Sequence, residues 1–172
     1  LHEAHEHGIV HRDLKPENIM LVMRAGQAGV VKVMDFGIAS VRDGERLAPE
    51  TRITRAGIAY GTPAYMSPEQ VAGQTDIDGR ADLYSLGIML YEMLTGSHPF
   101  DAQNAAAMMA QHLTTLPPAP SLKAPSVKIP PALEELVLRL LAKEPLDRPQ
   151  SAAETKEALH QLAAAQTLQQ SM

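Results

Sequence analysis

Cysteine is absent from the 172-residue chain. Its absence excludes a disulfide scaffold, a zinc site built on thiolates and a cysteine nucleophile. The chain also has no tryptophan and only two phenylalanines, so its nine methionines and numerous leucines and alanines must fill the interior. The longest apolar run covers residues 86–91, whereas a membrane-spanning helix needs roughly 18 residues. We see no signal peptide at the start of the sequence.

Positive charge is also in short supply. Fifteen lysines and arginines face twenty aspartates and glutamates, which gives a net charge of −5. The basic residues are scattered, so we expect no nucleic-acid partner and no membrane contact by this segment. The apolar share of 45% is sufficient for a packed core, and the length fits one domain or slightly more. Because residue 1 is leucine, we expect a piece of a longer protein.

The spacing of apolar residues predicts a mainly α fold with a short β-hairpin. A helix that begins near Arg80 and ends at Gly96 carries one broad apolar stripe, and a second amphipathic helix covers Leu133 to Leu141. The other expected elements are a helix end at 1–8, strands at 19–23 and 30–34, a surface loop at 40–62 and a short helix at 102–113. We also expect a last helix that starts from a capping box of Ser151 and Glu154 and frays over 166–172.

Two further segments have alternative interpretations. Six prolines between Pro117 and Pro131 exclude a helix interior. They fit a loop draped over the helical core or a ligand for an aromatic-lined groove, and the lack of flanking disorder favours the loop. The segment HEAHEH at residues 2–7 contains metal-binding residue types, but its spacing is neither HExxH nor HxxEH. We therefore interpret its side chains as exposed residues on a helix end.

The most specific pattern is an ordered series of short motifs. HRDLKPEN at residues 11–18 is followed by DFG at 35–37, GTP at 61–63, SPE at 67–69, DLYSLG at 82–87 and finally Arg148. Together they resemble the signature set of protein kinases. Residues 1–162 match the helical C-terminal lobe of the eukaryotic-like (Hanks-type) serine/threonine kinases of bacteria. The resemblance implies a protein-kinase-like fold with the C-terminal lobe only, from an α+β parent domain, and leaves 163–172 as a helix end or the start of a linker.

The resemblance implies chemical roles for five residues. Phosphoryl transfer depends mainly on positioning and charge neutralisation. Asp13 is the expected acceptor of the substrate hydroxyl proton, and Lys15 is expected to contact the γ-phosphate of ATP. Asn18 and Asp35 are expected to hold Mg²⁺, with Mn²⁺ as an alternative, through hard oxygen ligands. Lys15 together with Thr62 resembles serine/threonine rather than tyrosine kinases, which implies a protein substrate with Ser or Thr.

Several other positions receive packing roles from the same resemblance. His11 and Phe36 correspond to a stacked column beneath the site, and Gly37 allows the chain to turn after the metal ligand. Met20 matches the residue that packs under the adenine ring, although a plain core position explains an apolar strand residue equally well.

Three charged residues are expected to hold this lobe together. Glu69 and Arg148 correspond to a buried ion pair that ties the activation segment to the last helices. Asp82 corresponds to an acceptor for backbone N–H groups of residues 11–18, which by the same resemblance we call the catalytic loop. We assign structural rather than chemical roles to all three.

Residues 38–60 resemble an activation segment. Arg12 is its expected phosphate receptor, because arginine pairs with phosphate through two hydrogen bonds. Thr54 lies where related bacterial kinases carry an activating phosphothreonine, and Thr51 is the second candidate. The position two residues after Thr54, where a further threonine is common, is Ala56.

The chain departs from the kinase pattern before His11. The Gly-rich loop, the strand lysine and its helix glutamate lie upstream in the family, and only ten residues precede His11 here. Smaller departures are Ser67, in place of the usual alanine, and a slightly long hairpin turn. We expect the segment alone to bind ATP poorly and to transfer little phosphate.

Two hypotheses follow from this departure. The chain is part of an active Ser/Thr kinase, or it is a truncated kinase-like binding module or scaffold. The intact Asp13, Lys15, Asn18 and Asp35 favour the enzyme. We expect a cytoplasmic location for the segment. Membrane anchoring of the parent chain and a dimer for trans-autophosphorylation are left open by the sequence.

Overall fold

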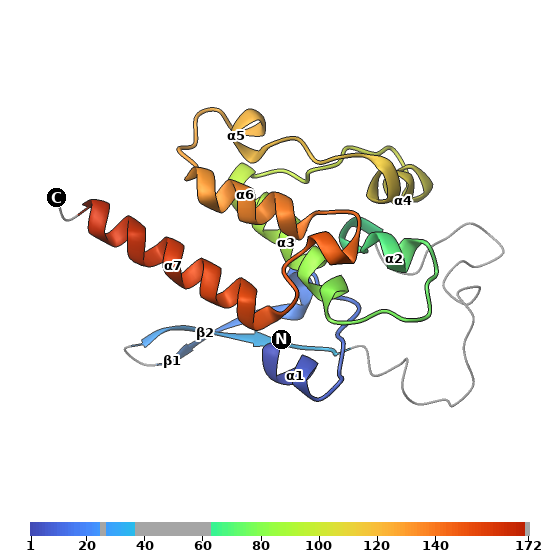
Figure 1. Cartoon of the computed structure of the whole chain (residues 1–172), viewed down its shortest axis with the longest axis horizontal. Coiled ribbons are helices and arrows are strands. Elements are labelled where there is room, and N and C mark those ends of the chain that lie inside the picture. The colour runs from blue at the N-terminus through green and yellow to red at the C-terminus, as the bar shows by residue number, and fades with distance from the viewer. Residues whose placement is uncertain (25–26, 37–62, 171–172) are drawn as a thin grey trace.

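A computed structural model of the chain describes residues 1–24, 27–36 and 63–170 and has a mostly helical body beside one two-stranded antiparallel sheet (Figure 1). This confirms the predicted fold class. In chain order the elements are α1 (His2–Glu6), η1 (Pro16–Asn18), β1 (Ile19–Arg24), β2 (Gln27–Val33), η4 (Pro63–Tyr65), α2 (Pro68–Val71), α3 (Arg80–Thr95), α4 (Ala105–Thr114), α5 (Pro120–Lys123), α6 (Pro131–Leu140), η5 (Pro145–Asp147) and α7 (Ala152–Gln170).

The central element is α3, which is buried on most of its circumference. It ends at Gly96, whose φ of 71° is the left-handed conformation that glycine adopts without strain. A Cβ on Gly87 would lie 2.8 Å from the Cβ of Leu140. Because glycine leaves this space free, α3 and α6 approach closely. The predicted helix from Arg80 to Gly96 is therefore confirmed.

Two apolar clusters form around α3. One contains Tyr84, Ile88 and Tyr91 from α3 with Val137 from α6, and Phe100 joins it from the following loop. The second packs Leu83 against Leu136 and Leu140 of α6, with Leu159 and Leu162 of α7 at its edge. The i, i+3, i+4 spacing on α6 thus faces the core, as the sequence indicates.

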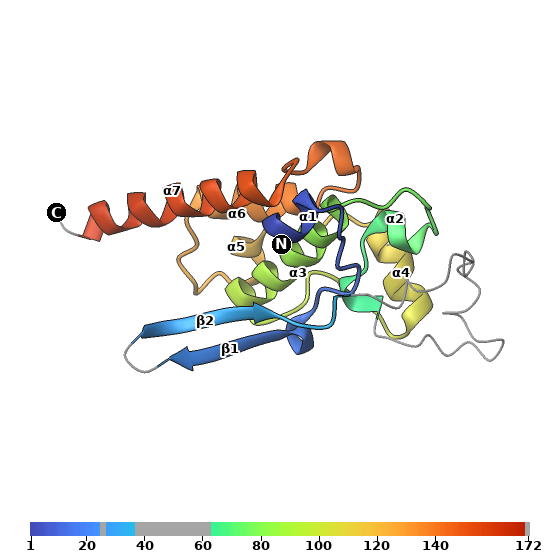
Figure 2. The same cartoon turned by 90° about the horizontal axis from the view of Figure 1, so that it is seen from below.

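The hairpin of β1 and β2 lies along one side of the helical body (Figure 2). Ile19 pairs with Val33, Leu21 with Val31, and Val22 with Val30. Its apolar side chains are largely solvent-exposed, with Leu21 at 69% and Met23 at 79%. A two-stranded sheet that leaves such side chains exposed has little stability of its own.

Helix boundaries differ from the sequence expectation at α4, in the proline-rich segment and at the end of the last helix. Helix α4 begins at Ala105 rather than at 102, because the side chain of Asn104 accepts a hydrogen bond from the Ala107 N–H over 2.9 Å and caps it there. The proline-rich segment contains a short helix, α5, with Pro120 in its first turn, where proline is tolerated.

Helix α7 starts from a modified capping box. Ser151 Oγ accepts the Glu154 N–H at 3.0 Å, but the Glu154 carboxylate accepts from the Gln150 N–H rather than from Ser151. The helix continues to Gln170, past the point where we expected fraying (Figure 1). Over the described ranges, none of the helices combines the length and the apolar character that crossing a bilayer requires.

Candidate active site on the catalytic loop

Three of the residues predicted to act on substrate and ATP are joined by hydrogen bonds. Lys15 Nζ lies 2.8 Å from Asp13 Oδ2. Asn18 Nδ2 donates to the Asp13 carbonyl oxygen at 2.8 Å and lies 3.4 Å from Asp13 Oδ2. The Asn18 side chain is buried while the Asp13 side chain is half-exposed, at 50%. The asparagine therefore acts as a fixed support, and the carboxylate faces outward on a short, braced loop.

Asp82, on the first turn of α3, holds the backbone of this loop from below. Its Oδ2 accepts the His11 N–H and its Oδ1 accepts the Arg12 N–H, both at 2.8 Å. Arg12 has a φ of 64°, which is rare for a non-glycine residue. The Asp82 carboxylate is only 1% exposed, and the two hydrogen bonds that it accepts compensate for the backbone strain at Arg12. They also fix the position of Asp13, the next residue.

His5 is a residue of this site that the sequence interpretation missed. We expected the histidines of 2–7 to be exposed, but His5 is only 13% exposed and its Nε2 donates to Asp82 Oδ2 at 2.8 Å. A Cβ on Gly79 would lie 2.5 Å from the His5 ring, so glycine makes room for it. The sequence gives no sign of this contact, because 77 residues separate His5 from Asp82. In contrast, His2 and His7 are exposed, as predicted.

The hairpin brings the second metal-ligand candidate to the loop. Because Ile19 pairs with Val33, the residues just before β1 and just after β2 must lie side by side. The Met34 N–H donates to the Asn18 carbonyl at 2.8 Å, and Asp35 follows directly. Asp35 has a φ of 53° and is exposed. The fold thus places an amide and a carboxylate from separate chain segments at one end of the sheet.

His11 and Phe36 pack together beneath these residues. Their ring centroids are 4.8 Å apart. His11 is fully buried, and its Nε2 donates to the Met34 carbonyl at 2.8 Å. Its Nδ1 accepts the Asp13 N–H at 3.2 Å, so the hydrogen of the ring lies on Nε2. A single imidazole therefore connects the catalytic loop to the end of β2.

The donor set at this end of the sheet fits a hard divalent cation. Magnesium is usually held by one or two protein oxygens and completes its shell with waters and substrate phosphates. Asn18 uses its Nδ2 to bond the loop, which leaves its amide oxygen for a cation. Within residues 1–24, 27–36 and 63–170, there is no cluster of three or more His, Cys, Asp or Glu side chains that could hold a metal alone. Asn18 and Asp35 therefore suit an ion that is shared with a phosphate ligand.

Glu69 and Arg148 form a buried, two-pronged ion pair. Arg148 donates to the two carboxylate oxygens of Glu69 at 2.7 and 2.8 Å, and its side chain has no exposed surface. The remaining donors reach the carbonyls of Ala142, Arg80 and Lys143 at 2.9 Å each. Every part of the guanidinium is therefore satisfied, and α2 is tied to α3 and to the segment before α7.

Helix α2 is also tied to the catalytic loop. Gln70 Nε2 donates to the Arg12 carbonyl at 2.7 Å, and a capping box of Ser67 and Gln70 orients that amide. Ser67, the departure from the usual alanine, thus supplies the helix cap.

Four of the predicted residues, Gly37, Thr51, Thr54 and Thr62, lie outside the described residues. Met20 lies on β1 with 45% of its surface exposed. Arg12 makes no side-chain hydrogen bond or ion pair with the described part of the chain, so its guanidinium has no partner there.

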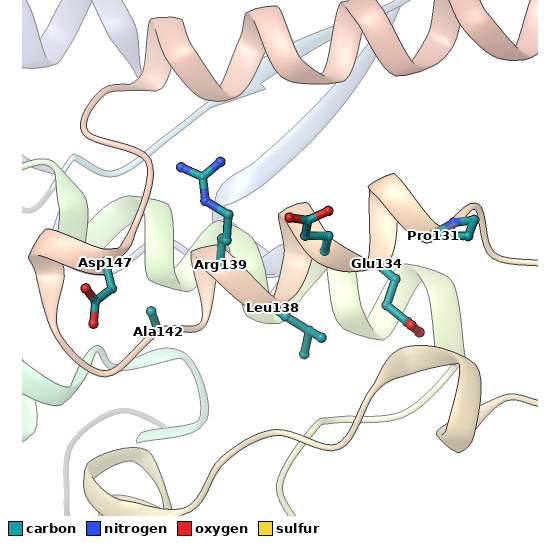
Figure 3. A pocket seen from close by; sticks show the side chains of 7 residues that line it. Pro131, Glu134, Leu138, Arg139, Ala142 and Asp147 are labelled. Carbon is teal, nitrogen blue, oxygen red and sulfur yellow. The ribbon is translucent and has the colours of Figure 1, made fainter.

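A separate groove of about 450 Å³ runs along α6 (Figure 3). It is lined by three apolar residues and four charged residues, namely Pro131, Leu138 and Ala142 with Glu134, Glu135, Arg139 and Asp147. None of the predicted catalytic residues lines it. The site is therefore assigned by its hydrogen-bonded side chains and not by this groove.

Comparison with known proteins agrees with this geometry. The protein kinase domain family matches residues 1–162. Serine/threonine-protein kinase Pkn1 of Myxococcus xanthus is 51% identical over 159 residues, 92% of this chain and 22% of that protein. Serine/threonine-protein kinase pkn3 of the same organism is 49% identical over 152 residues, 88% and 27% respectively. PknB of Mycolicibacterium smegmatis is 43% identical over 158 residues, 91% and 23%. The chain thus spans about a quarter of the length of these curated relatives.

Proposed function

The chain belongs to the protein kinase family, as a relative of the bacterial serine/threonine kinases, and we propose that it carries the catalytic loop of an enzyme that phosphorylates Ser and Thr hydroxyls of proteins with ATP. The observation that carries this proposal is the bonded group of Asp13, Lys15 and Asn18, held beside Asp35 by the hairpin. A chain without catalytic function has no physical need to hold the half-exposed Asp13 carboxylate and the Lys15 ammonium in this arrangement.

In the proposed reaction, Asp13 binds the substrate hydroxyl and accepts its proton as the oxygen attacks the γ-phosphorus of ATP. The bond from that phosphorus to the β,γ-bridging oxygen breaks, and ADP leaves. Lys15, 2.8 Å from the same carboxylate, offers a positive charge to the transferred phosphoryl group. Asn18 and Asp35 are the residues that would hold Mg²⁺, or Mn²⁺ in its place. When bound, such an ion neutralises charge on the phosphates. Protein residues therefore supply positioning and proton acceptance.

The ATP site requires a second surface above this lobe. Met20 and its neighbours on the hairpin are apolar and exposed, which suits a partner surface that covers the adenine ring. We propose that an N-terminal lobe with the Gly-rich loop and the strand lysine supplies it. We also propose that residues 1–162 form the C-terminal lobe, and that 163–172 are a helix end or the start of a linker. Coding sequence upstream of Leu1 that contains these motifs in frame would agree with this division.

Activation is proposed to depend on Thr54, with Thr51 as the alternative. The Arg12 guanidinium, which has no partner among the described residues, is the proposed receptor for the phosphate. Transfer from a second copy of the chain requires a transient dimer. Because ATP is abundant inside cells, we place this segment in the cytoplasm. Mass-spectrometric mapping of the active protein should find phosphothreonine 54, and an active protein with Thr54 unmodified would contradict the assignment.

Mutation of Asp35 distinguishes the enzyme from a non-catalytic scaffold. In the complete gene product, transfer of labelled phosphate from ATP to a Ser/Thr peptide should fall about 100-fold or more in Asp35→Asn, because a metal ligand is lost. Asp147→Asn, at an exposed position outside the site, is the matched control and should retain full activity. A wild-type protein that transfers no phosphate would instead support the scaffold.

A further inference from the structure

The turn η4 (Pro63–Tyr65), which directly follows Thr62, is held by bonds to all three of its carbonyl oxygens. The Met66 N–H reaches the Pro63 oxygen at 3.2 Å within the turn. The other two bonds come from distant side chains. His98 Nε2 donates to the Ala64 oxygen at 2.8 Å, and Ser85 Oγ donates to the Tyr65 oxygen at 2.7 Å.

The imidazole of His98 is itself fixed in place. Its Nδ1 lies 3.1 Å from the backbone nitrogen and 3.0 Å from the carbonyl oxygen of Phe100. Its Nε2 carries the hydrogen in the bond to Ala64, because a carbonyl oxygen can only accept. Its ring packs edge-on against Tyr65, Phe100 and His112, with centroids 5.9 to 6.1 Å away. An imidazole that is bonded at two nitrogens and packed on three sides has little freedom to release the turn.

The turn also lies beside the catalytic loop. The Tyr65 hydroxyl donates to Glu92 at 2.8 Å, and burial, this hydrogen bond and the nearby carboxylate charges raise the pKa of the tyrosine. Gln70, five residues after Tyr65, bonds the Arg12 carbonyl. The segment from η4 to α2 is therefore held against the catalytic loop, on the side from which a peptide could present a hydroxyl to Asp13.

We propose that His98 is a positioning residue for the protein substrate, because it holds the Ala64 carbonyl and thereby shapes the turn that the substrate contacts. This inference rests on the proposed kinase function. Ser85 performs the parallel task for Tyr65, but it also bonds within α3, so its removal would disturb the helix as well. His98 belongs to the loop after α3, so its substitution tests the hydrogen bond to the turn with less disturbance of that helix.

The test compares the kinetics of His98→Ala and His98→Gln in the complete gene product. The acceptor probe is a synthetic peptide with the sequence of residues 47–58 of this chain, which contains Thr51 and Thr54. His98→Ala should raise the KM for the peptide about tenfold, the effect of one lost hydrogen bond, with no change in the KM for ATP. His98→Gln places an amide N–H where Nε2–H was and should restore the peptide KM to within about twofold. His160→Ala, on the exposed face of α7, is the matched control.

The possible outcomes separate the inference from the function beneath it. A wild type that phosphorylates the peptide, with an unchanged peptide KM in His98→Ala, overturns the inference alone. An equal rise in both KM values, or a loss that His98→Gln does not restore, also overturns it, because His98 would then act only in folding. A wild type that phosphorylates no Ser or Thr peptide overturns the proposed function and this inference together.

Discussion

The buried pair of Glu69 and Arg148 should dominate the stability of this lobe. Glu69→Ala removes the acceptor of two charge-assisted hydrogen bonds of 2.7 and 2.8 Å and leaves a guanidinium without exposed surface. Two such bonds are worth about 3–6 kcal/mol, and breaking a buried pair typically costs about 3–5 kcal/mol. For a chain of this length about 4 kcal/mol corresponds to a fall of about 10 °C in Tm.

Urea unfolding followed by circular dichroism measures this loss directly. Glu69→Gln keeps one acceptor oxygen and should recover about half of the lost stability. Arg139→Ala, which breaks the exposed pair with Glu154, is the control and should cost about 0.5 kcal/mol or less. If Glu69→Ala lowers the free energy of unfolding by less than about 1 kcal/mol, the buried ion pair does not stabilise this lobe as we propose.

The other predictions concern titration and the residue that the sequence interpretation missed. Burial lowers the pKa of His112 to about 3. Below about pH 6.5 the unfolded state therefore binds a proton at this histidine that the folded state does not bind. The free energy of unfolding should fall by up to about 1.4 kcal/mol per pH unit as the pH is lowered from 6 to 4. His112→Asn should show a flatter profile, and an identical slope would contradict the assignment. Burial, with the charge of Arg148, lowers the pKa of Lys143 to about 8. The free energy of unfolding should therefore rise between about pH 8 and 10.5 in the wild type and stay level in Lys143→Met. The control Lys156→Met, at an exposed position, should behave as the wild type. His5→Ala removes a bond to Asp82 and should cost about 1–2 kcal/mol in urea unfolding, whereas His7→Ala should cost nothing; equal effects would show that burial of His5 is immaterial.

Local signals predicted most of the helices and the hairpin. The apolar stripe on α3 and its glycine stop are properties of nearby residues in the sequence, and so are the short apolar runs that contain Ile19 and Val33. The start of α4 was misjudged because Ala102 and Gln103 before Asn104 also favour a helix and hide its capping role. The length of α7 was underestimated because its last turns lack an apolar stripe, although alanine and glutamine favour a helix there.

The residues of the candidate site also fall into those that the sequence predicts and those that only the structure identifies. The motif residues Asp13, Asn18 and Asp35 could be named from the sequence because their order is distinctive. His5 and His98 could not, because each gains its role from a partner that lies far away in the sequence and close in space. A histidine has no periodic signal that separates a buried hydrogen-bond donor from a solvated side chain.

Single-turnover phosphoryl transfer by Asp13→Asn tests the central claim most directly. The complete gene product is saturated with ATP and Mg²⁺ and mixed with the 47–58 peptide, and labelled phosphopeptide is counted after rapid quenching. The account predicts that the transfer rate falls by about 10²–10⁴-fold while ATP affinity stays unchanged, because Asp13 acts on the hydroxyl proton and not on the nucleotide. A rate equal to that of the wild type would contradict the catalytic assignment.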